Sequence, residues 1–196
     1  MLKPFASALI VTTAVSSISL QAFAEESAQA IFAGGCFWCM ESDFEKLPGV
    51  TDVVSGFTGG TAANPTYNGN HDGHYEAVLV TYDPAQVSYA ELLDHFWINI
   101  DPFDAGGQFC DRGPSYLSAI FVDDEQRDPA EASKRAVEER FSNQDIVTPI
   151  LDAATFYPIQ GEESYHQDYY KHSSVRYQFY RWNCGRDRRL AEIWGE

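Results

Sequence analysis

Two cysteines in the segment Gly34-Gly-Cys-Phe-Trp-Cys39 are the residues best suited to redox chemistry. A thiol acts as a nucleophile only as the thiolate, and the unpaired N–H groups at the start of a helix stabilise that anion. The glycine pair permits a sharp turn and leaves the sulfur of Cys36 uncrowded, and apolar residues at helical spacing follow it. We therefore predict that Cys36 is a nucleophile at the first turn of a helix. The alternative is a buried, inert cysteine beside a tight turn.

Cys36 and Cys39 also form a C-x-x-C pair, which at the start of a helix is typical of thioredoxin-like redox proteins. A disulfide oxidoreductase that uses Cys36 and Cys39 is therefore the alternative enzyme. A structural zinc site needs two such pairs, whereas Cys110 and Cys184 are isolated in the sequence, so we predict no metal. A third alternative is not an enzyme but an acidic exported binding module whose cysteines form structural bridges.

A longer pattern extends from this pair along the chain. The segment Gly34–Glu41 resembles the active-site signature of the peptide methionine sulfoxide reductase A family. Further segments resemble that family in the same order: 56–60, 64–67, 73–78, 82–84, 96–97, 101–102, 111–116 and 118–120. The resemblance implies an enzyme that reduces the S-epimer of methionine sulfoxide, peptide-bound or free, and so repairs oxidised proteins. It also implies a cysteine sulfenic acid and an intramolecular disulfide as intermediates.

The resemblance assigns the nucleophile to Cys36 and the general acid to Glu76. When a thiolate attacks a sulfoxide sulfur, negative charge develops on the oxygen, which leaves only once it is protonated. Glu76 can supply that proton at neutral pH only if apolar surroundings raise its pKa, because burial disfavours the carboxylate. We expect Phe37, Trp38 and nearby tyrosines to provide those surroundings.

The resemblance also assigns residues that hold the substrate. Tyr67 and Tyr116 match tyrosines whose hydroxyls hydrogen-bond the sulfoxide oxygen, and Asp111 matches an acidic residue that orients the substrate and a nearby water. Phe37 and Trp38 match the apolar pocket for the S-methyl group. Without the resemblance, each tyrosine would be interpreted as a packing residue with a satisfied hydroxyl.

The residues leave open which thiol resolves the sulfenic acid into a disulfide. Cys184 resembles the family's C-terminal recycling cysteine and ranks first. Cys39 is closer in sequence and ranks second, and Cys110, beside Asp111, ranks third. A structural Cys39–Cys110 bridge is the least favoured pairing.

The chain shows no motif for a bound cofactor. No glycine-rich phosphate-binding loop follows a predicted strand, so we expect neither a nucleotide nor a flavin. Electrons would then come from a thioredoxin-type protein by thiol–disulfide exchange. His74 lies close to Glu76, and His166 lies in a tyrosine-rich segment that resembles a helix bordering the family's pocket. We interpret both histidines as packing or hydrogen-bonding residues.

The elements that position these residues follow from hydrophobic periodicity. Strands are predicted at 30–33, 50–57, 76–82, 116–122 and 150–153. Helices are predicted at 36–47, 88–97, 123–141 and 162–171, the second opened by a capping box at Ser88. In the third helix we expect Ala132, Ala136 and Val137 to face inward, with Pro129 marking a kink or the true start. Segments 61–73 and 101–114 are predicted to be loops.

This order of elements and the resemblance together predict an α+β fold in a single domain. We expect a central mixed β-sheet flanked by helices, with a ferredoxin-like α/β sandwich core. No clear periodicity is present from Arg181 onward, so a long irregular C-terminal tail is predicted.

Composition and the first residues bear on location and partners. The chain has 196 residues and a net charge of −16, and an acidic chain repels nucleic acid and anionic lipid, so we expect neither as a partner and predict a monomer. Residues 1–24 combine Lys3, an apolar run and an Ala22-Phe-Ala24 cleavage pattern, as in a secretory signal peptide. We predict a signal peptide at 1–24, a catalytic domain at 25–196, and export to the periplasm or into the medium.

Overall fold

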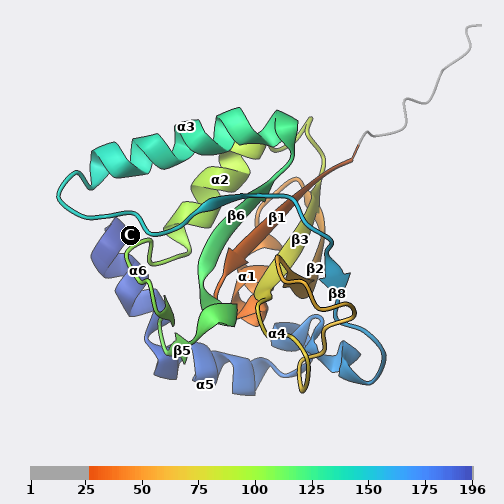
Figure 1. Cartoon of the computed structure of the whole chain (residues 1–196). Coiled ribbons are helices and arrows are strands. Elements are labelled where there is room, and N and C mark those ends of the chain that lie inside the picture. Colours follow the sequence, from red (N-terminus) through yellow and green to blue (C-terminus); the bar gives the residue numbers. More distant parts are fainter. Residues whose placement is uncertain (1–26, 196) are drawn as a thin grey trace, which may run out of the picture.

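The computed structural model describes residues 27–195 (Figure 1), so the predicted signal peptide at 1–24 lies outside the described residues. In chain order the elements are β1 (Ala28–Gly34), α1 (Phe37–Phe44), β2 (Val50–Thr58), β3 (Tyr75–Tyr82), α2 (Tyr89–Ile98), β4 (Gly107–Gln108), β5 (Asp111–Arg112), β6 (Ser118–Val122), α3 (Asp124–Arg140), β7 (Ile150–Asp152), β8 (Tyr157–Pro158), α4 (Tyr169–His172), α5 (Ser174–Cys184) and α6 (Arg186–Trp194). Single 3₁₀ helices occupy Pro114–Tyr116 and Gly161–His166.

The central sheet has the strand order β7-β6-β1-β3-β2-β8. β3 lies between β1 and β2 and runs antiparallel to both, so β1 and β2 are parallel to each other and are connected through α1. With α2 and β6 this completes the β-α-β-β-α-β order of a ferredoxin-like core. β6 pairs in parallel with β7, which makes the sheet mixed. The predicted α+β architecture is therefore confirmed.

Both α1 and α2 pack on one face of the sheet. The ring of Phe32 on β1 stacks on Phe44 of α1 at 5.0 Å and on Phe96 of α2 at 5.1 Å between centroids. The predicted capping box at Ser88 is present, since its hydroxyl accepts from the Glu91 N–H and the Glu91 carboxylate accepts from the Ser88 N–H. The packing of Phe32 against both helices holds the N-terminus of α1 at the end of β1, next to Cys36.

The inward face of α3 differs from the prediction. Ala130 and Val137 are buried, whereas Ala132 and Ala136 are exposed. The indole of Trp97 donates to the Ser133 hydroxyl at 2.7 Å, which turns the Ala130–Val137 side of the helix toward α2. Pro129 lies inside the helix, which begins at Asp124 behind an Asp123 cap.

The predicted irregular C-terminal tail is wrong, because the segment forms α5 and α6. Gly185, in the left-handed conformation at φ +68°, ends α5 and begins α6. The indole of Trp194 is buried and donates to the Ile100 carbonyl at 3.1 Å, so the end of the chain is anchored on the core. Figure 1 shows both helices in blue, with α5 below the ends of the central strands and α6 at the left of the view. Among the described helices none is both long and apolar enough to cross a membrane.

The predicted helix at 162–171 is also interrupted. A 3₁₀ helix ends at His166 and α4 begins at Tyr169, because Asp168 adopts the left-handed conformation at φ +54°. The predicted loop at 101–114 contains the short β4–β5 hairpin, which carries Asp111.

Candidate active site

Cys36 lies where the chain turns from β1 into α1, as predicted. It is the N-terminal cap residue of α1, and its side chain is 5% exposed. Gly35 makes the turn in the left-handed conformation at φ +80°, and a Cβ there would lie 2.5 Å from Cβ of Gln108. A side chain at position 35 would therefore displace the segment that precedes Cys110.

Glu76 on β3 points at the same turn. Its Oε2 accepts the Phe37 N–H at 3.1 Å, and the side chain is 3% exposed. Burial raises the pKa of Glu76 to about 8, although hydrogen bonds from the Phe37 N–H and the Tyr116 hydroxyl act in the opposite direction. At neutral pH the carboxyl therefore keeps its proton, as a general acid must.

Cys36, the cap residue of α1, and Cys39 lie one turn apart, and each thiol affects the pKa of the other. Burial raises the pKa of Cys36, and the nearby Cys39 and Glu76 raise it further. The pKa of Cys39 is lowered to about 7, because the Cys36 thiol donates to its sulfur and the guanidinium groups of Arg186 and Arg181 are near. The helix N-terminus is expected to favour the Cys36 thiolate, whereas burial in the structure raises the pKa of this thiol.

Tyr67 and Tyr116 are brought to this turn from distant segments. Both are half-buried, and burial raises the pKa of each hydroxyl, with Glu76 and Cys36 adding to the effect. Both hydroxyls therefore remain donors next to the sulfur and the carboxyl. Asp111 on β5 is half-buried and accepts a hydrogen bond from the Tyr180 hydroxyl.

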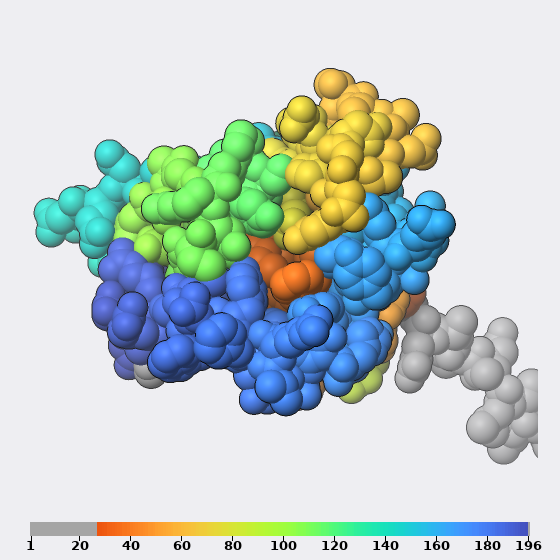
Figure 2. Space-filling view, turned by 90° about the horizontal axis from the view of Figure 1, so that it is seen from below, coloured from red at the N-terminus to blue at the C-terminus, as the bar shows by residue number. Residues whose placement is uncertain are grey.

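The two predicted pocket aromatics occupy different depths. Phe37 is fully buried and packs edge-on against Phe57 at 6.0 Å. Trp38 is half-buried, stacks on Tyr169 at 4.0 Å, and donates through its indole to Nδ1 of His166 at 3.0 Å. Trp38 thus forms the wall of the site and Phe37 supports it from beneath. Figure 2 shows the orange start of α1 at the bottom of a hollow, between yellow, green and blue segments far apart in the sequence.

The two histidines have the packing and hydrogen-bonding roles expected of them. His166 is buried against Trp38 and Tyr67. His74 is buried, accepts the Gly60 N–H at 3.3 Å, and bonds the Ala62 carbonyl through its other nitrogen.

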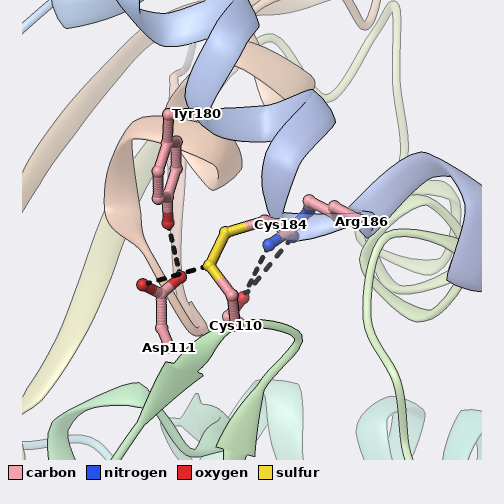
Figure 3. Close-up of a disulfide and its surroundings, with 6 residues drawn as sticks. Cys110, Asp111, Tyr180, Cys184 and Arg186 are labelled. Carbon is pink, nitrogen blue, oxygen red and sulfur yellow. Dashed lines mark hydrogen bonds between the residues drawn. A yellow bond between two sulfur atoms is a disulfide. The ribbon is translucent and has the colours of Figure 1, made fainter.

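The structure joins Cys110 to Cys184 in a disulfide with a Cα–Cα distance of 4.9 Å (Figure 3). Cys36 and Cys39 are buried free thiols. Cys184, ranked first as the resolving thiol, is therefore bonded to Cys110 in this structure. Cys39 is the thiol that lies next to the nucleophile, and the Cys39–Cys110 bridge does not form.

Three site residues were not predicted. Tyr180 and Arg181 are presented by α5, and Arg186, buried at the start of α6, donates to the Asn99 carbonyl at 2.6 Å. The spacing of Tyr177, Tyr180, Arg181 and Cys184 marks one helical face, and this signal could have been recognised in the sequence.

Within residues 27–195, two groups of side chains have the composition of a cation site. In the first, Cys110, Asp111 and Cys184, both sulfurs are already joined to each other. The second consists of Glu41, Glu45 and Asp168, and the ammonium of Lys171 contacts the latter two at 2.6 Å each. The lysine therefore already offsets part of the negative charge of the second group and occupies its carboxylates.

Comparison with known proteins gives one consistent result. The model of a family described as peptide methionine sulfoxide reductase matches residues 28–196. The chain is 51% identical over 175 residues to peptide methionine sulfoxide reductase MsrA 2 of Caulobacter vibrioides, covering 88% of both chains. It is 49% identical over 176 residues to the MsrA protein of Bacillus subtilis, covering 87% of this chain and 98% of that one.

Solved structures agree with these relatives. Methionine sulfoxide reductase A of Corynebacterium diphtheriae is 31% identical and superposes with a TM-score of 0.66, covering 74% of each chain. The reduced form of Mxr1 from Saccharomyces cerevisiae, 24% identical, has the same fold at a TM-score of 0.64, covering 74% of this chain and 85% of that one.

Proposed function

The chain belongs to the peptide methionine sulfoxide reductase family, and we propose that it reduces the S-epimer of methionine sulfoxide with Cys36 as nucleophile and Glu76 as general acid. One observation carries the assignment of roles. A buried carboxyl that keeps its proton at neutral pH is hydrogen-bonded to the N–H of Phe37, the residue next to Cys36. Proton donor and nucleophile therefore face the same small volume.

In the first step Cys36 passes its proton to Cys39 and attacks the substrate sulfur. Glu76 protonates the oxygen as charge develops on it, and the hydroxyls of Tyr67 and Tyr116 donate to the same oxygen. The S–O bond of the substrate breaks and an S–OH bond forms at Cys36, so the thiol is oxidised by two electrons and the sulfoxide is reduced to methionine. Trp38 holds the methyl group on the sulfur.

In the second step Cys39 resolves the sulfenic acid. Its sulfur displaces hydroxide from Cys36, giving a Cys36–Cys39 disulfide and one water. The guanidinium groups of Arg186 and Arg181, which act to lower the pKa of Cys39, remain near it in this step and favour its thiolate. An external thioredoxin-type dithiol then reduces the pair by thiol–disulfide exchange.

The protein works, in this proposal, on exported substrates. The pattern at residues 1–24 supports export, to the periplasm or into the medium. Cell fractionation with an antibody against the full chain tests this, and accumulation of the uncleaved chain in the cytoplasm would contradict it.

One assay tests the function and the roles of the cysteines. The chain without residues 1–24 is incubated with each epimer of a methionine sulfoxide peptide and dithiothreitol. We expect reduction of the S-epimer alone, and its loss in Cys36→Ser. Cys39→Ser should complete a slower first turnover and then retain a sulfenic acid that dimedone traps. Cys184→Ser serves as the matched cysteine control and should still end as the Cys36–Cys39 disulfide, with no sulfenic acid left for dimedone to trap.

Two results would contradict this assignment. Reduction of insulin disulfides without sulfoxide turnover would favour the thioredoxin-like alternative. If Cys36 still formed a disulfide in Cys39→Ser but no longer formed one in Cys184→Ser, the resolving thiol would be Cys184.

A further inference from the structure

Tyr180 is a residue of the site to which the mechanism above gives no role. It lies on α5, and its ring packs against the cluster formed by Cys36, Cys39 and Tyr177 and stands edge-on to Trp38 at 5.7 Å. Its hydroxyl donates to the carboxylate of Asp111 (Figure 3). Tyr180 therefore approaches the reacting sulfur from the C-terminal helices, whereas Tyr67 and Tyr116 belong to other segments.

The hydroxyl of Tyr180 interacts with both Asp111 and the cysteine pair. Burial and the charges of Cys36, Cys39 and Asp111 raise the pKa of Tyr180, so the hydroxyl remains a donor. A hydrogen bond from Tyr180 is also the interaction that lowers the pKa of Cys36, against the effect of burial. The hydroxyl has a single proton, which Asp111 accepts in this structure, and the Cys36 sulfur is the alternative acceptor.

The Cys110–Cys184 disulfide joins the two elements that carry this hydrogen bond. Cys184 follows Tyr180 by one turn of α5, and Cys110 directly precedes Asp111 on the β4–β5 hairpin. The bonded cysteines are 74 residues apart in sequence, so the covalent bond holds together two segments that are distant in the chain. Figure 3 shows the disulfide beside the Tyr180–Asp111 hydrogen bond.

We propose that Tyr180 is a further catalytic residue, whose hydroxyl turns its hydrogen bond from Asp111 to the Cys36 sulfur as the thiol loses its proton, and that the Cys110–Cys184 disulfide holds the hydroxyl between these two acceptors. The proposal rests on the proposed function, since it concerns the same nucleophile. Cys110 is exposed, so a dithiol in solution can reach the bond. Reduction adds two electrons and two protons, gives two thiols, and releases α5 from the hairpin. The disulfide thereby couples the redox state of the surroundings to the reactivity of Cys36.

The test compares one protein in two redox states. The first has the Cys110–Cys184 disulfide and two free thiols, verified by thiol titration after denaturation. The second is fully reduced with a phosphine that is then removed, and has four free thiols. Each is mixed with an excess of a methionine-S-sulfoxide peptide without any reductant, and the rate of the first turnover is measured by quenched flow with quantification of methionine.

We expect the wild type to be several-fold faster with the disulfide than without it. Tyr180→Phe should be slower than wild type by about 10-fold or more, the usual effect of losing a hydrogen bond to a charged group. It should also show no further loss on reduction, because the disulfide acts through this hydroxyl. Tyr170→Phe removes a hydroxyl that donates to Glu45 and should keep the wild-type difference between the two states.

Equal wild-type rates in the two states would overturn the proposal, as would a wild-type rate in Tyr180→Phe or an undiminished effect of reduction in that variant. A merely structural role of Tyr180 would lower the rate and leave the effect of reduction in place. A wild type that makes no methionine in either state would contradict the proposed function itself, so the two failures are distinguishable.

Discussion

At the scale of single residues, the chemistry depends on two acidic groups whose pKa values lie close together. The pKa of Cys39 is lowered to about 7 by the hydrogen bond from Cys36 and by two arginines, and burial raises that of Glu76 to about 8. The reaction requires that the cysteine pair has lost one proton and that Glu76 has kept its own. Only a narrow range of pH between the two values satisfies both conditions.

The rate of the first turnover should therefore be bell-shaped, rising with pH through about 7 and falling through about 8. The carboxyl is protonated below its raised pKa, so activity that depends on it is lost as pH rises through that value. Glu76→Gln should slow the reaction about 10²-fold and remove the falling limb. Glu41→Gln is the matched control. Burial also raises the pKa of Glu41 to about 8, but this carboxyl accepts the Asp168 N–H and not the N–H next to Cys36, so the falling limb should remain. A falling limb that persists in Glu76→Gln would exclude Glu76 as the acid.

At the scale of elements, the site depends on the turn between β1 and α1. Gly35 and Gly73 have nearly the same left-handed φ, +80° and +81°, but only Gly35 lies against a neighbour, Gln108. Each change to alanine should cost about 1–2 kcal/mol in backbone strain. Gly35→Ala should cost more and also lower activity, because it displaces Cys36 relative to Glu76. Denaturant unfolding and the sulfoxide assay measure both effects, and equal losses in the two variants would contradict this account.

Some elements of the fold could be predicted from local sequence patterns, and others could not. The strands around Phe32 and Val78 and the capping box at Ser88 follow from local patterns, and the structure confirms them. The inward face of α3 depends on the hydrogen bond between Trp97 and Ser133, which lie 36 residues apart. Hydrophobic periodicity within the helix carries no information about such a distant contact.

The candidate site also has one part that could be predicted from the sequence and one part that could not. The structure brings together Cys36, Glu76 and Asp111, which the family resemblance assigned to the site because the motifs that carry them are nearly continuous segments. The pairing of Cys110 with Cys184 and the contact of Tyr180 with Asp111 join segments about 70 residues apart, and no short motif records them.

At the scale of the whole molecule, α6 closes the fold onto its core. Trp194 is 7% exposed, its ring lies 5.1 Å from the guanidinium of Arg140, and its indole bonds the Ile100 carbonyl. Trp194→Ala should lower the free energy of unfolding by about 3–5 kcal/mol, as expected for removing a large buried aromatic side chain. Trp182→Ala, at a side chain 74% exposed, should change it by less than about 0.5 kcal/mol. Similar losses in the two variants, measured by urea denaturation, would show that α6 contributes little to the core.

The depth of Cys36 decides which damaged residues the enzyme can repair. Cys36 is only 5% exposed, and Figure 2 shows the start of α1 at the bottom of a hollow between segments from three parts of the chain. An oxidised methionine must extend its entire side chain into this hollow to reach the sulfur. A sulfoxide packed inside another folded protein cannot do so until its own surroundings open. Repair therefore proceeds soonest at surface and loosely held positions, and slowest in the interiors of stable proteins.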